Sequence, residues 1–196
     1  MYHYYYHYYL ITFCSFAAPS CTAGLDIGIL LDKTRSVDEG ELKQVITFLK
    51  DLVNKFKPAP DEDHFGFITF QGKTATLVFD FAASEFYNKS RLLDKINKIP
   101  TKQAIDWGTR TDLALQMARD QLFTKAGGDR PDRPNVMLVL TDGKPHSLPT
   151  DRNFAEFAKN ISSDFRVSTH SLVFNRNPVN ACWPYIQVTL RFYRKY

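Results

Sequence analysis

Cysteine is scarce in this chain of 196 residues, and the sequence motifs of several enzyme classes are missing. The three cysteines, Cys14, Cys21 and Cys182, form no Cys-x-x-Cys pair, so nothing supports a zinc site or a thioredoxin-type redox site. No Gly-x-Gly-x-x-Gly, Walker or Gly-x-Ser-x-Gly motif occurs. The usual signatures of dinucleotide, nucleotide and serine-hydrolase sites are therefore absent.

Long runs of one charge and long apolar runs are missing as well. The formal net charge is +4, but cations and anions are interspersed without a long basic block, which argues against nucleic acid as a partner. The apolar run at residues 10–18 is too short to cross a membrane. A hydrophobic content of 44% and a charged content of 23% are typical of a globular domain, and the length allows one domain with extensions.

The first 20 residues differ from the rest of the chain. A tract of Tyr and His at residues 1–9 precedes the apolar run 10–18, and small residues follow. This pattern resembles a secretory signal peptide over residues 1–20, cleaved between Ala18 and Ala23, and predicts a secreted protein. The Lys or Arg that usually precedes the apolar run is absent, so a mispredicted or non-native N-terminus is the alternative.

Two further features are typical of a secreted protein. Cleavage before Cys21 would leave Cys21 and Cys182, which either form a disulfide or remain two unrelated thiols. Asn88 and Asn160 each begin an Asn-x-Ser sequon, which predicts a glycoprotein, although such triplets also occur by chance.

Apolar runs typical of buried strands alternate with amphipathic helices through most of the chain. In order, we expect a strand at 25–31, a helix at 37–56, strands at 65–70 and 75–81, helices at 90–99 and 113–123, a strand at 136–140, a helix at 153–161 and a strand at 165–174. This order predicts an α/β fold with a mostly parallel sheet, helices on both faces, and 75–81 as an antiparallel edge strand.

Three polar loops follow predicted strands or precede predicted helices. Asp32, Thr34 and Ser36 come directly after the first buried strand, Thr109 precedes a helix, and Asp142 follows the strand 136–140. The carboxyl ends of parallel strands meet at one edge of a sheet, which would bring Asp32 and Asp142 together. Carboxylate and hydroxyl oxygens suit a hard cation such as Mg²⁺, with Mn²⁺ or Ca²⁺ as alternatives. Helix capping explains the Asp32 loop as well as a metal does, and capping or turn formation is the better explanation of Thr109 and of Asp142 when each is taken alone.

The three loops together resemble the von Willebrand factor type A domain. The segments are Leu-Asp-Ile-Gly-Ile-Leu-Leu-Asp-x-Thr-x-Ser, Gly-Thr-Arg-Thr-Asp-Leu-Ala-Leu and Val-Met-Leu-Val-Leu-Thr-Asp-Gly-Lys-Pro, within residues 21–174. The resemblance implies a Rossmann-like, doubly wound fold. It also implies a metal-ion-dependent adhesion site, with the metal ligands Asp32, Thr34, Ser36, Thr109 and Asp142.

The resemblance implies binding rather than catalysis, and it is closest in style to collagen-like and matrilin-like matrix modules. The implied partner is a matrix or cell-surface protein that supplies an acidic residue to the metal, outside the cell. A metal-dependent phosphoester hydrolase on a similar fold is one alternative. A metal-free structural matrix module is another.

Four features depart from the family pattern. Thr34 replaces the usual Ser. Lys33 and Arg35 place two cations beside the implied metal ligands, where they would weaken metal binding or attract acidic partners. The tail 175–196 is too short for the final helix, strand and helix of the family, which predicts a truncated or divergent C-terminal part.

Overall fold

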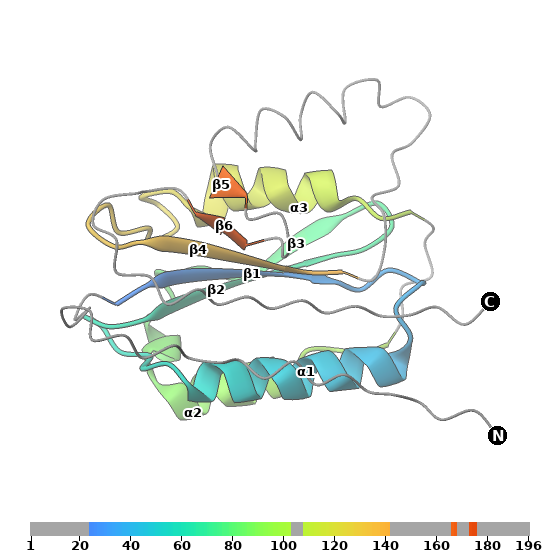
Figure 1. Cartoon of the computed structure of the whole chain (residues 1–196), viewed down its shortest axis with the longest axis horizontal. Coiled ribbons are helices and arrows are strands. Elements are labelled where there is room, and N and C mark those ends of the chain that lie inside the picture. The colour runs from blue at the N-terminus through green and yellow to red at the C-terminus, as the bar shows by residue number, and fades with distance from the viewer. Residues whose placement is uncertain (1–23, 103–107, 142–165, 168–172, 176–196) are drawn as a thin grey trace.

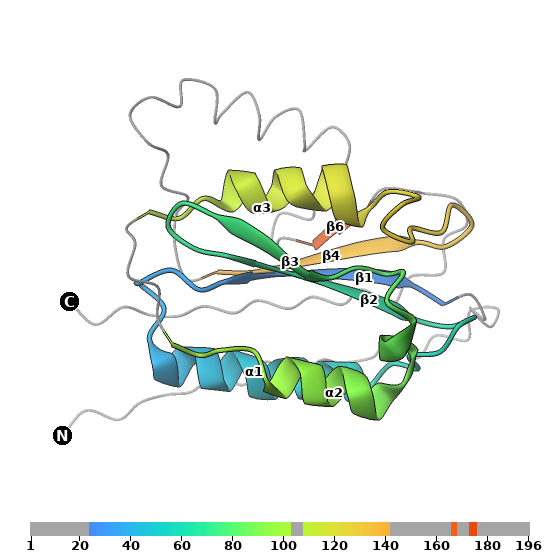
Figure 2. The same ribbon diagram turned by 180° about the vertical axis from the view of Figure 1, so that it is seen from behind.

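A computed structural model of the chain describes residues 24–102, 108–141, 166–167 and 173–175. They form a six-stranded sheet in the order β3-β2-β1-β4-β6-β5, with helices on both faces (Figures 1 and 2). The strands are β1 (Asp26–Asp32), β2 (His64–Phe70), β3 (Ala75–Phe79), β4 (Asn135–Leu140), β5 (Arg166–Val167) and β6 (Val173–Asn175). The helices are α1 (Glu39–Asn54), η1 (Ser84–Tyr87), α2 (Lys89–Asn97), α3 (Thr111–Met117) and η2 (Ala118–Leu122).

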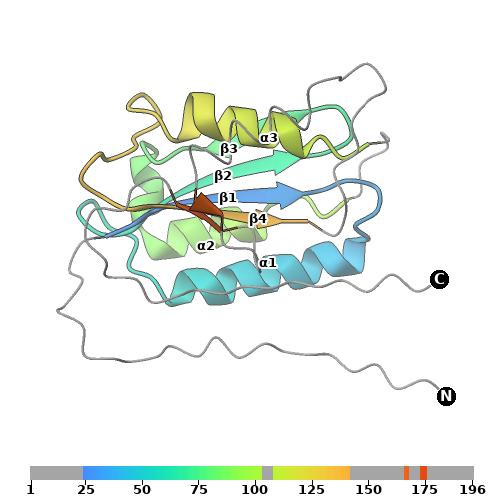
Figure 3. The same cartoon turned by 45° about the horizontal axis from the view of Figure 1, so that its top comes forward.

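The central strand β1 pairs in parallel with β2 on one side and with β4 on the other. All seven of its residues are buried, as expected for a continuous apolar run covered on both faces. The three parallel strands therefore end at the same edge of the sheet (Figure 3). β3 pairs antiparallel with β2 at the outer edge, as the sequence predicts.

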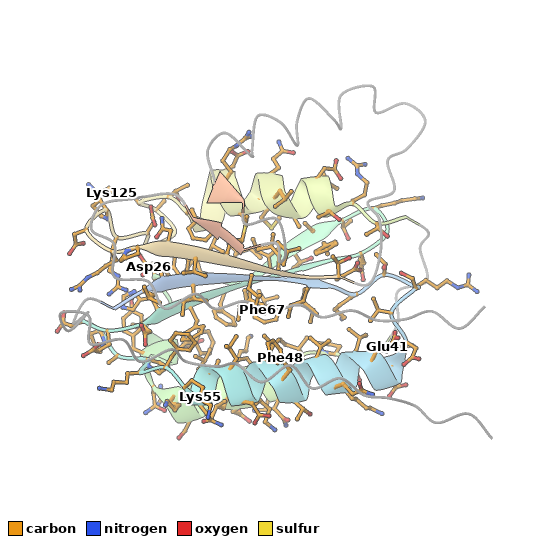
Figure 4. All side chains as sticks on the ribbon, viewed as in Figure 1. Asp26, Glu41, Phe48, Lys55, Phe67 and Lys125 are labelled. Carbon is orange, nitrogen blue, oxygen red and sulfur yellow. The ribbon has the colours of Figure 1, made fainter. Side chains whose placement is uncertain are left out.

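The helices α1 and α2 cover one face of the sheet. The Asp38 carboxylate accepts a hydrogen bond from the Glu41 N–H, and the Glu41 carboxylate accepts one from the Asp38 N–H, which fixes the start of α1. In Figure 4, Phe48 of α1 and Phe67 of β2 lie between this helix and the sheet, whereas Lys55 lies on the outer side. The expected helices at 37–56 and 90–99 are thus confirmed, with ends shifted by a few residues.

On the other face of the sheet, η2 and the residue after it, Phe123, pack directly against two glycines of the sheet. The Phe123 N–H donates to the Ala118 carbonyl, which makes η2 a turn of π-helix after α3. A Cβ at Gly28 would lie 2.7 Å from the Phe123 ring, and one at Gly66 would overlap the Leu122 side chain. These glycines let the helix approach closely, and the expected helix at 113–123 corresponds to α3 followed by η2.

The prediction of one continuous strand at 165–174 is wrong. The structure has two short strands there, β5 and β6, which pair antiparallel with each other, and β6 pairs antiparallel with β4. β5 and β6 therefore run in opposite directions, and the sequence between them includes Ser-Thr-His-Ser, which interrupts the apolar run. No Gly or Pro marks this reversal, so the pattern gave no turn signal.

Several expectations fall outside the described residues. They are the signal peptide at 1–20, the helix at 153–161, and, apart from Asn175, the truncated or divergent part at 175–196. Within the part of the chain that the structure describes, no helix is both long enough and apolar enough to span a bilayer.

The amino end of the sheet carries a buried row of polar side chains. Asp26 pairs in register with His64 on β2 and with Asn135 on β4, and all three are at least nine-tenths buried. Arg130 closes this row. Its side chain donates to the Asp26 Oδ1 atom at 2.6 and 2.9 Å, and its backbone N–H donates to the Oδ2 atom at 2.8 Å. His64 stacks on the Tyr87 ring with 4.2 Å between ring centroids.

The contact of η2 with Gly66 predicts that even one methyl group there is destabilising. We expect Gly66→Ala to lower the free energy of unfolding by about 1–3 kcal/mol, because the new Cβ must displace Leu122 from a close-packed core. Urea denaturation measures the change. The control is Gln44→Ala on the exposed side of α1, where the change is expected to stay within about 0.5 kcal/mol. Equal stability of the Gly66 variant and the parent would contradict this packing.

The buried row also predicts a pH dependence of stability. Burial and the Arg130 guanidinium lower the pKa of His64 from its ordinary 6.5, against the opposing effects of the Pro60 carbonyl and the Asp26 carboxylate. His64 therefore binds a proton more readily in the unfolded chain than in the folded one. Its contribution to the free energy of unfolding is fully present above about pH 6.5 and is lost as the pH drops below that value. We expect His64→Gln to flatten the slope of unfolding free energy between about pH 7.5 and 5. An unchanged slope in urea titrations would refute this assignment.

Candidate functional site

The loop after β1 brings three of the predicted ligands together. The Asp32 Oδ1 atom accepts a hydrogen bond of 2.8 Å from the Thr34 N–H, which folds the loop back over the end of the strand. The Thr34 and Ser36 hydroxyl oxygens lie 3.0 Å apart. Asp32 and Thr34 are buried, whereas Ser36 is exposed, so the cluster reaches from the sheet edge to the surface.

The end of β4 meets this loop through a residue that sequence reasoning missed as a site residue. The Thr141 hydroxyl donates a hydrogen bond of 2.6 Å to the Asp32 Oδ2 atom, because Leu31 and Leu140 are partners in the parallel register. Asp142, the predicted ligand, is the next residue but lies outside the described part of the chain. The hydroxyl directly before Asp142, at the end of a buried strand, was the available signal for Thr141.

The third loop approaches the same strand end from the other side. The Lys33 N–H donates to the Phe70 carbonyl at the end of β2. Two residues later, the Gly72 carbonyl oxygen would lie 2.9 Å from a Cβ at Gly108, which has a φ of +106°. A left-handed backbone in this contact favours glycine. Thr109 follows directly and is buried, which places it beside the turn that begins at the end of β2.

The two cations beside the cluster differ in exposure. Arg35 is exposed, whereas Lys33 is partly buried, and burial lowers the pKa of the Lys33 ammonium. Arg110, which precedes α3, holds the Asp112 carboxylate through its Nε and Nη2 atoms at 2.7–3.1 Å. The Asp112 carboxylate is therefore committed to a neighbouring guanidinium.

The described side chains fit a hard divalent cation by chemistry and by spacing. Neighbouring oxygen ligands of an octahedral Mg²⁺ with bonds of about 2.1 Å lie about 3.0 Å apart, which is also the separation of the Thr34 and Ser36 hydroxyl oxygens. Asp32 adds a carboxylate, which also accepts the hydrogen bonds from Thr34 and Thr141. Among the described residues, no three His, Cys, Asp or Glu side chains gather into a group that could hold a metal ion.

Sequence comparisons identify relatives that are longer than this chain. Human matrilin-1 is 29% identical over 133 residues, which cover 66% of this chain and 26% of matrilin-1. Chicken integrin alpha-1 is 30% identical over 132 residues, 66% of this chain and 44% of the integrin sequence. The chain therefore spans less than half of the length of either relative.

Solved structures agree with the fold. The structure of proximal thread matrix protein 1 from the mussel byssus has a TM-score of 0.61 at 21% identity, covering 72% of this chain and 35% of that one. The manganese-loaded TRAP protein of Plasmodium vivax has a TM-score of 0.59 at 18% identity, covering 74% and 55%. The family model for the von Willebrand factor type A domain matches residues 26–181, so the chain belongs to the von Willebrand factor type A domain family.

Proposed function

We propose that this chain is a non-enzymatic adhesion or matrix-binding module that holds a protein ligand through a bound Mg²⁺. The observation that carries the proposal is the oxygen cluster at the end of β1, where the Thr34 and Ser36 hydroxyls lie 3.0 Å apart beside the buried Asp32 carboxylate. Membership of the von Willebrand factor type A family supports it.

The proposed metal ligands have different tasks. Thr34 and Ser36 would supply neutral hydroxyl oxygens, and Asp32 would supply negative charge directly or through water. Thr109 and Asp142 would complete the set from the other two loops; Asp142 follows Thr141, which contacts Asp32. The exposed Ser36 side of the cluster leaves room for a ligand carboxylate from the partner.

The bound ion would supply an electrostatic anchor for an acidic side chain. Mg²⁺ keeps water molecules in its shell, and a carboxylate from another protein can replace one of them. The proposed set has three neutral hydroxyls and two carboxylates, which at most balance the charge of the ion, so a further carboxylate from a partner can still be accommodated in place of water. The relatives include matrilin-1 and an integrin subunit, and they support binding rather than hydrolysis.

The proposal includes a location and a domain arrangement. We propose a signal peptide at residues 1–20, the binding domain at 21–174 and a divergent tail at 175–196, in a secreted protein of the extracellular matrix. The small residues near position 20 and the sequons at Asn88 and Asn160 support secretion. The family match over residues 26–181 supports a single domain in this region.

Titration calorimetry of the purified chain with Mg²⁺ tests the metal site. We expect Mg²⁺ to bind the parent chain, and Asp32→Asn and Ser36→Ala each to weaken binding by about 10-fold or more, because a ligand atom or its charge is lost. Ser36 is exposed, so its variant should fold like the parent.

The matched control is Thr47→Ala, which removes an exposed hydroxyl from α1 and should leave Mg²⁺ binding unchanged. Absence of Mg²⁺ binding to the folded parent would exclude the metal-dependent mechanism in favour of a metal-free matrix module. Turnover of a generic phosphoester, lost in Asp32→Asn, would favour the hydrolase alternative instead.

Thr141 should position the proposed metal ligand rather than bind the metal. Its hydroxyl fixes the Asp32 carboxylate, and such supporting hydrogen bonds commonly contribute about 10–100-fold to metal affinity. We expect Thr141→Val to weaken Mg²⁺ binding in that range and, in EDTA, to lower the free energy of unfolding by about 1.5–3 kcal/mol. Thr141→Ser keeps the hydroxyl and should restore both properties. A Val variant that binds Mg²⁺ like the parent would rule out this role.

A further inference from the structure

One of the two Asn-x-Ser sequons, Asn88-Lys89-Ser90, lies at the start of α2. Asn88 and Ser90 are both exposed, and Asn88 joins η1 to α2 in an extended conformation, with a φ of −97° and a ψ of 116°. The other sequon, at Asn160, lies outside the described residues. An Asn-x-Ser triplet can be modified only where it is accessible, so the surface position separates Asn88 from a triplet that occurs by chance.

The two polar atoms of the Asn88 side chain are used differently in the fold. The Oδ1 atom accepts a hydrogen bond of 3.1 Å from the Arg91 N–H, which caps the start of α2. The Nδ2 atom is the other branch of the planar amide, and it donates to no residue in the part of the chain that the structure describes. N-linked sugars are attached at Nδ2. A glycan can therefore be added to Asn88 while its Oδ1 atom still caps the helix.

The strands place Asn88 at the amino end of the sheet. Its neighbour Tyr87 stacks on His64, which is the first residue of β2 and pairs in register with Asp26, the first residue of β1. Asp32 of the proposed metal site is the last of the seven residues of β1. At about 3.3 Å per residue, the two ends of β1 are about 20 Å apart. Asn88 therefore lies at the opposite end of the sheet from the proposed metal ligands.

The helix α1 gives a second, independent measure of this separation. The Lys89 ammonium donates to the carbonyl of Asn54, the last residue of α1, at 3.3 Å. α1 has 16 residues and is about 24 Å long, and it begins shortly after the loop of the proposed metal site. Figure 4 shows Glu41 near the start of α1 and Lys55 near its other end. The end of α1 and the start of α2 thus form one corner of the molecule, away from the proposed metal site.

We propose that Asn88 carries an N-linked glycan, which covers this corner. The proposal rests on the secretion proposed above, because the sugar donor, a lipid-linked oligosaccharide pyrophosphate, is met in the secretory pathway. A bond forms between Nδ2 and the anomeric carbon of the first sugar, and the bond from that carbon to the phosphate oxygen breaks. The lipid pyrophosphate leaves with the electron pair of the broken bond, and Nδ2 loses one of its two protons. The product is still an amide, whose Oδ1 atom can accept from the Arg91 N–H.

The glycan would decide which end of the domain meets other proteins. N-linked glycans are bulky and solvated, so they keep the surface beneath them from packing against a partner. The exposed side chains of Lys55, Lys57 and Arg91 lie beside the Lys89 contact with α1 or one turn along α2 from Asn88. They would be shielded, whereas the loop of the proposed metal site at the other end of β1 would remain open to a ligand.

Mass spectrometry of the full chain produced in eukaryotic cells tests the modification. The chain is expressed once with its own N-terminus and once behind an established secretory leader, and it is recovered from the endoplasmic reticulum and from the medium. We expect the peptide that contains Asn88 to carry a glycan that peptide-N-glycosidase removes. A glycan found only behind the added leader would refute the proposed signal peptide and leave the Asn88 site standing. An unmodified Asn88 in the chain with the added leader would overturn the proposal.

Substitutions within α2 separate the sequon from the helix cap. Asn88→Asp keeps a side-chain oxygen that can cap α2 but lacks Nδ2, and Ser90→Ala removes the hydroxyl of the sequon, so each should lose the glycan from this peptide. Ser90→Thr keeps the sequon and should keep the glycan. The matched control is Asn97→Asp, which changes an exposed asparagine of the same helix outside any sequon and should also keep it. A glycan that persists in Asn88→Asp would place the modification on another residue.

Acetylation of lysine side chains tests which surface the glycan covers. We expect Lys55 to react at least about twofold more slowly in the glycosylated chain than in Asn88→Asp, because the sugar stands over the corner that includes the end of α1. Lys73 is the internal control, since it is exposed in the turn after β2, at the same end of the sheet as the proposed metal site, and its rate should not change. Equal rates at Lys55 in the two chains, or an equal slowing at Lys73, would contradict the proposed cover.

Discussion

The parallel pairing of β1 between β2 and β4 is the constraint on which the candidate site depends. Because Leu31 is in register with Thr69 on one side and with Leu140 on the other, the loops that follow the three strands must leave the sheet at one edge. This register is what brings Thr141 within 2.6 Å of Asp32 across 109 positions of sequence. A shift of one residue would turn Asp32 to the other face of the sheet, so the same pairing that buries the core also builds the site.

The packing on the α3 face holds this register in place. Gly28 and Gly66 are neighbours in the pairing of β1 with β2, and the absence of their side chains makes the hollow that Leu122 and Phe123 fill. Filling a hollow in a close-packed interior resists sliding of one strand past the other, since any slip would leave a cavity beneath η2. The two glycines in the middle of the strands thus contribute to the alignment of polar residues at the strand ends.

Sequence patterns predicted the features that depend on residues close together in the sequence. The apolar run of β1, the apolar stripe of α1 and the loop of Asp32, Thr34 and Ser36 are all readable because periodicity and short spacing determine them. The bond from Thr141 to Asp32 depends on register between distant strands, which no local pattern encodes. The reversal between β5 and β6 was missed for a related reason, because antiparallel pairing with β4 overrides a run that is locally suited to one strand.

The two ends of β1 show how one strand can serve opposite purposes. At the amino end, the buried Asp26 carboxylate is held by the Arg130 guanidinium and the Arg130 N–H, a pair that closes the fold over a polar row. At the carboxyl end, Asp32 accepts from the Thr34 N–H and the Thr141 hydroxyl, beside further hydroxyl oxygens that can turn toward a cation. A guanidinium locks a carboxylate in place, whereas hydroxyls can either donate to it or join it as ligands. The chemical identity of the neighbours, rather than the burial of the aspartate, therefore separates the structural end of the strand from the end that we propose binds a metal.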